Sequence, residues 1–163
     1  MEINALTPRT QENYRGQKIT AVFASGDPIW AMFFAILDRG KYIGSVRNGS
    51  YLFTSPSGMH ERYYFISINK KMEKDEPWRR GAVYVLPMST FYPTHAGNLR
   101  FDEWASDEPV KPEEKIEILP SEFPFIWQIA VHNDKEPMYL SWLKYRRRIK
   151  SKPYRALDDS ELL

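Results

Sequence analysis

Positive charge is concentrated near the end of the chain, where residues 144–155 contain seven cations and no acid. Of the 23 lysines and arginines, 16 lie elsewhere, against 21 acids, so a basic segment follows a mildly acidic body. Such a segment can neutralise phosphates, and neighbouring tyrosines can stack on bases. One interpretation is a nucleic-acid-binding surface over 144–155, formed by Arg146, Arg147, Arg148 and Lys150. The alternatives are a solvated helix face, which also suits the negative end of a helix dipole, and docking onto the acidic body of the same protein.

General acid–base chemistry would fall to a histidine, and the chain has three: His60, His95 and His132. His60 precedes the predicted strand 62–68 and is followed by Glu61, so this pair provides the candidate catalytic residues. Adjacent residues on a strand point to opposite faces, and the chain lacks cysteine, so we predict no metal site. The sequence also lacks a Gly-x-Ser-x-Gly nucleophile elbow and a phosphate loop of the Gly-x-x-x-x-Gly-Lys type.

A strand followed by a helix over residues 20–37 is the frame that must position these groups. Ser25-Gly26 favours a sharp turn, because Gly accepts backbone angles closed to other residues. Asp27 then suits the N-cap of the helix, and Pro28 suits its first position. With Gly40 as the expected stop, the pattern predicts a helix over 28–39. Residues 29–37 are all apolar, so we expect a core helix that is covered on all sides. This apolar run is too short to cross a bilayer, which needs about 20 residues.

Runs of aromatic and β-branched residues predict strands at 62–68 and 82–86, which we expect to pair antiparallel. Asn48-Gly49 favours positive backbone angles and predicts a hairpin turn within 42–54. Charged and apolar residues alternate over 115–119, which is the pattern of a half-buried strand.

A second predicted helix covers residues 138–150 and carries one apolar stripe: Met138, Trp142, Tyr145 and Ile149. Strands followed by a late helix indicate an α+β class. We expect a mainly antiparallel sheet packed on the buried helix 28–39, with an amphipathic C-terminal helix. No linker divides the chain, so we predict a single domain over 1–155 and a short C-terminal tail over 156–163.

Composition narrows the setting without fixing a partner. The chain of 163 residues has a net charge of +2 and no cysteine, which excludes disulfides and thiolate chemistry. Its first residues show neither a basic start nor an apolar run, so we expect a cytoplasmic protein without a secretory signal or a membrane partner. Trp104 and other aromatic residues near predicted loops are candidates for lining a cleft that binds a planar ligand. The alternative is that they pack as lids over a small core.

The segment Ala21-Val-Phe-Ala-Ser-x-Asp-Pro-x-x-Ala31-x-x-x-Ala35 resembles a pattern in small ADP-ribosyltransferase-like proteins. The Leu-Thr-Pro-Arg sequence ending at Arg9 is similar to the segment that often precedes it. The resemblance covers residues 3–37 and implies that this strand forms one wall of an NAD cleft, with Ser25 as a cleft residue. Arg9, which can reach an anion, and Trp104 complete the predicted ligand-binding set.

The resemblance does not supply the catalytic groups of that family. Those proteins grip the nicotinamide end through an earlier strand with a His or Arg, and this strand has no counterpart in the sequence. Their glutamate can correspond here to Glu61, Glu103 or Glu122.

Three classes of function are compatible with these patterns. The first is an intracellular accessory or interaction domain that binds a protein partner and has no chemistry of its own. The second is a nucleotide-type cleft of ADP-ribosyltransferase-like fold beside Ser25, with NAD as its ligand. The third is a nucleic-acid-binding module that uses the basic C-terminal helix. Whether the chain is an enzyme stays open among them.

Overall fold

The computed structural model describes residues 3–12, 17–38, 40–41, 44–54, 60–73, 76–94, 103–151 and 157–158. The chain divides into two compact units. The first unit comprises Met1–Ile36 and Arg80–Leu119, and the second comprises Leu37–Arg79 and Pro120–Leu163. The predicted α+β class is confirmed, and every strand pair in the described ranges is antiparallel except one. The boundary between a domain over 1–155 and a tail over 156–163 stays a prediction.

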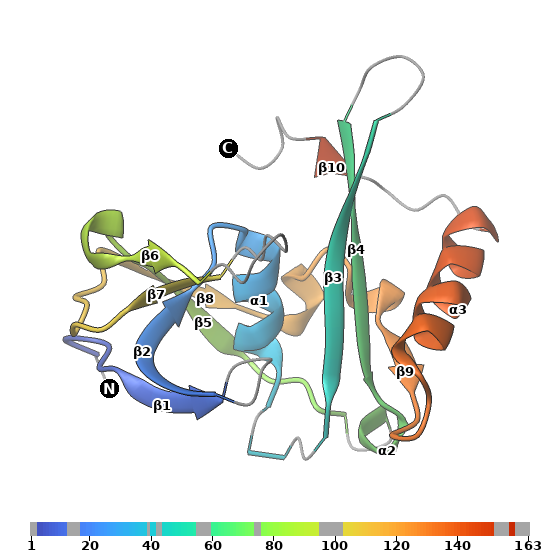
Figure 1. Cartoon of the computed structure of the whole chain (residues 1–163), viewed down its shortest axis with the longest axis horizontal. Coiled ribbons are helices and arrows are strands. Elements are labelled where there is room, and N and C mark those ends of the chain that lie inside the picture. Colours follow the sequence, from blue (N-terminus) through green and yellow to red (C-terminus); the bar gives the residue numbers. More distant parts are fainter. Residues whose placement is uncertain are drawn as a thin grey trace. The chain divides into compact units, whose positions relative to one another are not determined.

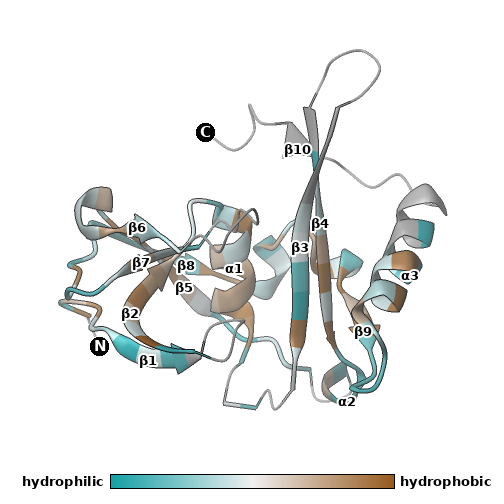
Figure 2. Ribbon diagram, viewed as in Figure 1, coloured by the Kyte–Doolittle hydropathy of each residue, from teal (hydrophilic) through white to brown (hydrophobic). Residues whose placement is uncertain are grey.

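The first unit is built on a sheet whose strands follow one another in the order β1, β2, β7 and β6 (Figure 1). Their bounds are β1 (Arg9–Glu12), β2 (Lys18–Ala24), β6 (Tyr92–Pro93) and β7 (Trp104–Ser106). Figure 2 contrasts the hydrophilic β1 with the apolar β2, which contributes Ala21 and Val22 to the core. A separate antiparallel pair joins β5 (Gly81–Val85) to β8 (Glu114–Ile118). The short 3₁₀ turn η1 (Met88–Thr90) follows β5.

Helix α1 (Pro28–Ile36) begins as the sequence predicts. The Asp27 carboxylate accepts the backbone N–H of Ile29 at 3.0 Å, which is the expected N-cap bond. The helix ends three residues before the predicted 39. Leu37 forms a β-bridge with Trp78, and the N–H of Asp38 donates to the carbonyl of Pro77 at 2.8 Å, so these pairings compete with a further helical turn.

The expectation that α1 is covered on all sides is wrong. Its buried residues are Ile29, Phe33 and Ile36, which share one face, whereas Phe34 is 37% exposed. Within the first unit the helix packs on β5 and β8. Gly81 at the start of β5 permits this packing, because a Cβ there would lie 1.9 Å from the carbonyl oxygen of Ala35.

The second unit is organised around the long hairpin of β3 (Val46–Thr54) and β4 (His60–Asn69). The predicted turn at Asn48-Gly49 is wrong, because these residues lie inside β3 and pair with Ile66 and Phe65. The predicted pairing of 62–68 with 82–86 is wrong as well. In the structure β4 pairs with β3, with β9 (Ala130–His132) and with β10 (Leu157–Asp158), and the β9 pairing is parallel. The single-turn helix α2 (Lys70–Glu73) follows β4.

Helix α3 (Met138–Ser151) confirms the second predicted helix and packs on β4 and β9. Tyr145 is fully enclosed, its ring centroid lies 5.0 Å from that of Phe65, and its hydroxyl donates to the carbonyl of Tyr64. The predicted apolar stripe is only partly buried, because Met138 at its start is 55% exposed. The preceding segment forms the 3₁₀ turns η2 (Pro120–Glu122) and η3 (Ile126–Gln128). In the described part of the chain no helix is long and apolar enough to span a membrane.

Candidate functional site

The predicted ligand-binding residues all lie in the first unit: Arg9 on β1, Ser25 just after β2 and Trp104 on β7. Trp104 pairs with Ala24, so it stands beside the end of β2 where Ser25 begins the turn. Arg9 pairs with Ala21 further along β2 and is exposed. The Ser25 hydroxyl accepts the N–H of Asp27 at 3.1 Å, and Asp27 itself caps the helix that follows. The fold therefore brings Trp104 to Ser25, while the α1 N-terminus already holds a carboxylate from its own chain.

The other predicted sites lie in the second unit. His60 and Glu61 begin β4 opposite Thr54 and Phe53, and their side chains lie outside the described part of the structure. The same holds for the side chains of three of the predicted nucleic-acid-binding residues on α3: Arg146, Arg148 and Lys150. Arg147 is exposed on that helix. Residues 152–155 lie outside the described residues.

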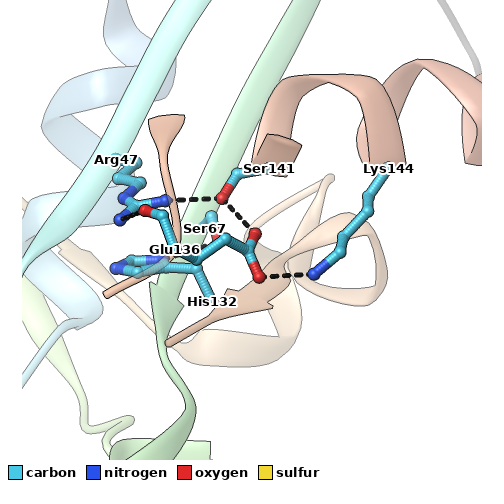
Figure 3. A network of polar contacts seen from close by, with 6 residues as sticks. All are labelled: Arg47, Ser67, His132, Glu136, Ser141 and Lys144. Carbon is cyan, nitrogen blue, oxygen red and sulfur yellow. Dashed lines mark hydrogen bonds and ion pairs between the residues drawn. The ribbon is translucent and has the colours of Figure 1, made fainter. Parts of the chain in front are cut away.

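A polar network that the sequence did not predict lies where β3, β4, β9 and α3 meet (Figure 3). Its centre is His132, the last residue of β9, which is 1% exposed. The Nδ1 atom of His132 lies 2.8 Å from the Oγ of Ser67, and the Nε2 atom lies 2.9 Å from the Oγ of Ser45. Ser67 is fully buried in β4, whereas Ser45 is exposed just before β3.

Strand register explains why these side chains meet. In the parallel pair β4–β9, His132 is opposite Asn69 and Ala130 is opposite Ser67. Ser67 and Asn69 are two residues apart, so both point to the face of the sheet that His132 shares. In the β3–β4 pair Val46 is opposite Ile68, which brings Ser45 to the same end of β4.

Burial keeps the imidazole of His132 neutral. Removal from water lowers the pKa of His132 below its ordinary 6.5, and the positive charge of Arg47 lowers it further. The carboxylates of Glu136 and Asp134 act in the opposite direction and are outweighed. A neutral imidazole has one nitrogen that donates and one that accepts, and each has a serine hydroxyl as its neighbour.

A second branch of the network ties the start of α3 to the sheet (Figure 3). One guanidinium nitrogen of Arg47 donates to the Oγ of Ser141 at 2.6 Å, and the other donates to the carbonyl of Glu136. Ser141 in turn donates to the Glu136 carboxylate at 2.7 Å, and that carboxylate also accepts from Lys144. These two donors lower the pKa of Glu136, whose side chain is only 8% exposed.

A neighbouring ion pair holds the segment between β9 and α3. Asp134 accepts from the amide of Asn69 and from Lys71, whose Nζ lies 3.1 Å away, and the Lys71 bond lowers the pKa of Asp134 most. Over the described ranges no group of three or more His, Cys, Asp or Glu side chains is arranged to hold a metal ion. The arrangement around His132 instead has the form of a hydroxyl, a base and a second hydroxyl.

His132 lies 65 positions after Ser67 and 87 positions after Ser45 in the chain, so no local sequence motif could predict that they meet. The available signal was the apolar run Ile129–Val131, which marks the residue after it as the end of a buried segment. A comparison of the chain with protein-family models, curated proteins and solved structures found no match. The resemblance to ADP-ribosyltransferase-like proteins therefore stays a prediction.

Proposed function

We propose that this chain is an interaction domain that binds an acidic, partly apolar segment of a protein partner through the solvent face of α3. Three large side chains that are exposed on this helix carry the proposal. Tyr139 is 63% exposed, Leu140 is 36% exposed and Leu143 is 38% exposed. Covering such surfaces is favourable by about 25 cal/mol per Å² of apolar area.

Helical spacing places these side chains on one face. Tyr139 and Leu143 are four residues apart and form one row, with Leu140 beside it, so these side chains point away from the buried Ser141 and Tyr145. The exposed Arg147 continues the row that begins at Tyr139. We call the set Tyr139, Leu140, Leu143 and Arg147 the α3 face.

The helix that carries the α3 face is held firmly to its own unit. Tyr145 packs on Phe65 and donates to Tyr64, and Ser141 lies between Arg47 and Glu136. A face that is already ordered loses little conformational entropy when a partner binds, which favours affinity. This anchoring supports a preformed docking surface.

The charge of the α3 face selects the chemistry of the partner. Its apolar residues come first and are followed by Arg147, and the sequence adds Arg146, Arg148 and Lys150 to the same helix. A second copy would meet the same cations and be repelled, whereas a segment with apolar side chains and carboxylates is complementary. We propose that this binding takes place in the cytoplasm.

Site-specific photo-cross-linking in cells tests the proposal. A photoreactive amino acid at position 139 is expected to give one discrete protein adduct that Leu143→Glu abolishes and Arg147→Glu weakens. The matched control carries the same amino acid at Met88, which is 67% exposed on η1 of the first unit. Adducts that are the same at both positions, or none at position 139, would exclude a docking face on α3.

Nucleic acid is the alternative outcome of the same experiment. If the adduct at position 139 contains nucleic acid, its yield should fall steeply with salt, because phosphate contacts release counterions. Retention on a phosphate matrix should then drop when Arg146, Arg147 and Arg148 are neutralised. If the adduct is a protein and retention on the phosphate matrix is unchanged, binding of a protein partner stays the proposed function.

A nucleotide cleft in the first unit is a second candidate function, favoured by the position of Trp104 beside the end of β2. An indole at the edge of a turn can stack on a planar base. Thermal-shift measurements with NAD and other nucleotides test it, with Trp104→Ala as the variant that removes the shift. If no nucleotide raises the melting temperature, this second function is excluded.

A further inference from the structure

We propose that Ser45 and His132 form a nucleophile and general base for acyl transfer from carboxylic esters, with Ser67 as the residue that positions the base. The site is independent of the α3 face, since none of its three residues belongs to that face. The chemical class of the substrate is an ester whose carbonyl carbon can reach the surface at Ser45.

The geometry around Ser45 meets the first requirement of nucleophilic catalysis. Its Oγ lies 2.9 Å from Nε2 of His132, within the range over which a base removes a proton directly. Ser45 is exposed, whereas His132 is 1% exposed and Ser67 is fully buried. An ester can therefore approach Ser45 from solvent while the base behind it stays shielded from water.

Ser67 meets the second requirement, which is a fixed ring orientation and tautomer. When Nδ1–H donates to the Oγ of Ser67, 2.8 Å away, the lone pair lies on Nε2 and faces Ser45. Ser67 lies within β4 and is held by the pairing of that strand with β9, so it fixes the ring in place. A hydroxyl supports a charged imidazolium less than a carboxylate does, so we expect slower turnover than in triads with aspartate.

Charges from each neighbouring element act on the base. Arg47 comes from β3, and Asp134 and Glu136 come from the segment after β9. Lys71, which follows β4, pairs with Asp134, and Lys144 of α3 pairs with Glu136, so both carboxylates are partly neutralised. With burial and Arg47 dominant, His132 is uncharged at neutral pH and ready to accept a proton.

The reaction balances without a cofactor. Nε2 of His132 takes the Ser45 proton as Oγ bonds to the ester carbonyl carbon. His132 then returns the proton to the alkoxy oxygen of the tetrahedral adduct, and the C–O bond to that oxygen breaks to release the alcohol. Water then attacks the acyl group on Ser45, giving its proton to Nε2. Release of the carboxylic acid returns that proton to Ser45, so ester and water become acid and alcohol.

Acetylation by p-nitrophenyl acetate tests the proposal. Peptide mass spectrometry is expected to find acetyl on Ser45, formed about 10²-fold faster than on Ser50, an exposed serine of β3. Ser45→Ala should remove this adduct and the matching burst of nitrophenolate, whereas Ser50→Ala should leave both unchanged. Acetylation of Ser45 no faster than that of Ser50 would overturn the proposal.

His132→Gln removes a buried group and could disturb folding as well as catalysis. Two further measurements therefore test the role of His132 without replacing it. In the unaltered protein the acetylation rate should fall at acid pH as His132 becomes protonated, with a midpoint below 6.5. Ser67→Ala should slow acetylation and move this midpoint, and Ser67→Thr should restore both. A pH-independent rate, or a midpoint that Ser67→Ala leaves in place, would exclude the roles assigned to His132 and Ser67.

Discussion

The buried His132 couples the stability of the second unit to pH. Its pKa is lowered on folding, so in the window below 6.5 the unfolded chain binds a proton that the folded chain does not. Stability from this residue is therefore complete above about pH 6.5 and falls as the pH drops toward the folded pKa. We expect the free energy of unfolding to decrease between pH 7 and pH 5.

Denaturant unfolding at several pH values checks this prediction, with His132→Gln as the comparison. The variant should be less stable at pH 7 by about 1–3 kcal/mol, because the buried hydroxyl of Ser67 loses its partner, and its stability should depend less on pH in this window. Asp134 and Glu136 also have lowered pKa values, but their contributions are lost at more acid pH, below their ordinary 3.8 and 4.5. If the free energy of unfolding changes with pH in the same way for both proteins, the pH dependence does not come from His132.

The Tyr145 hydroxyl offers a second test at the scale of a single group. It is buried and donates to the carbonyl of Tyr64, so Tyr145→Phe should destabilise the protein by about 1 kcal/mol. Tyr139 on the same helix is 63% exposed, and Tyr139→Phe should change stability by less than about 0.5 kcal/mol. Equal midpoints of urea unfolding for the two variants would refute the anchoring role of Tyr145.

Residue chemistry could be predicted from the sequence only where the partners are close along the chain. Asp27 caps α1 from two residues away, and the prediction is confirmed. The contacts of His132 come from residues 65 and 87 positions away, and they depend on a strand pairing that no local pattern encodes. His60 was predicted as the base from its place before a strand, whereas burial in the folded unit is what lowers the pKa of His132.

At the scale of elements, Gly81 controls how closely α1 approaches β5. A methyl group there would lie 1.9 Å from the carbonyl oxygen of Ala35 and 2.3 Å from its carbon, so the helix or the strand must move. Gly81→Ala should therefore cost about 3 kcal/mol or more in denaturant unfolding. Gly40→Ala is the matched control, because among the residues that the structure describes its new methyl group would meet only the Asp38 carboxylate, at 3.3 Å. Similar losses for both variants would argue against a close helix–strand contact.

Strands were located better than their partners were. The runs at 62–68, 82–86 and 115–119 are all strands in the structure, because β-branched and aromatic residues favour extended backbone locally. Pairing is set by the whole fold. β5 pairs with β8, and the connection between them is too long for a local sequence pattern to predict this pairing. Asn48-Gly49 favours a turn by itself, yet the pairing of β3 with β4 keeps it extended.

At the scale of the molecule, each unit has its own strand pairings and its own buried residues. The chain passes between the units after Ile36, Arg79 and Leu119, so neither unit is one continuous segment. If the units open separately, a mild defect in one should leave the other protected from hydrogen exchange. Asp27→Ala supplies such a defect in the first unit, because loss of a helix N-cap costs about 1 kcal/mol.

Hydrogen exchange read by mass spectrometry distinguishes separate from concerted opening. In Asp27→Ala, exchange should rise in α1, β5 and β8, while β4, β9 and α3 keep the protection of the unaltered protein. Tyr145→Phe should give the reverse pattern, with the increase confined to the second unit. If either variant instead raises exchange in both units equally, the chain unfolds as one cooperative body, and the predicted single domain over 1–155 is the better description of its folding.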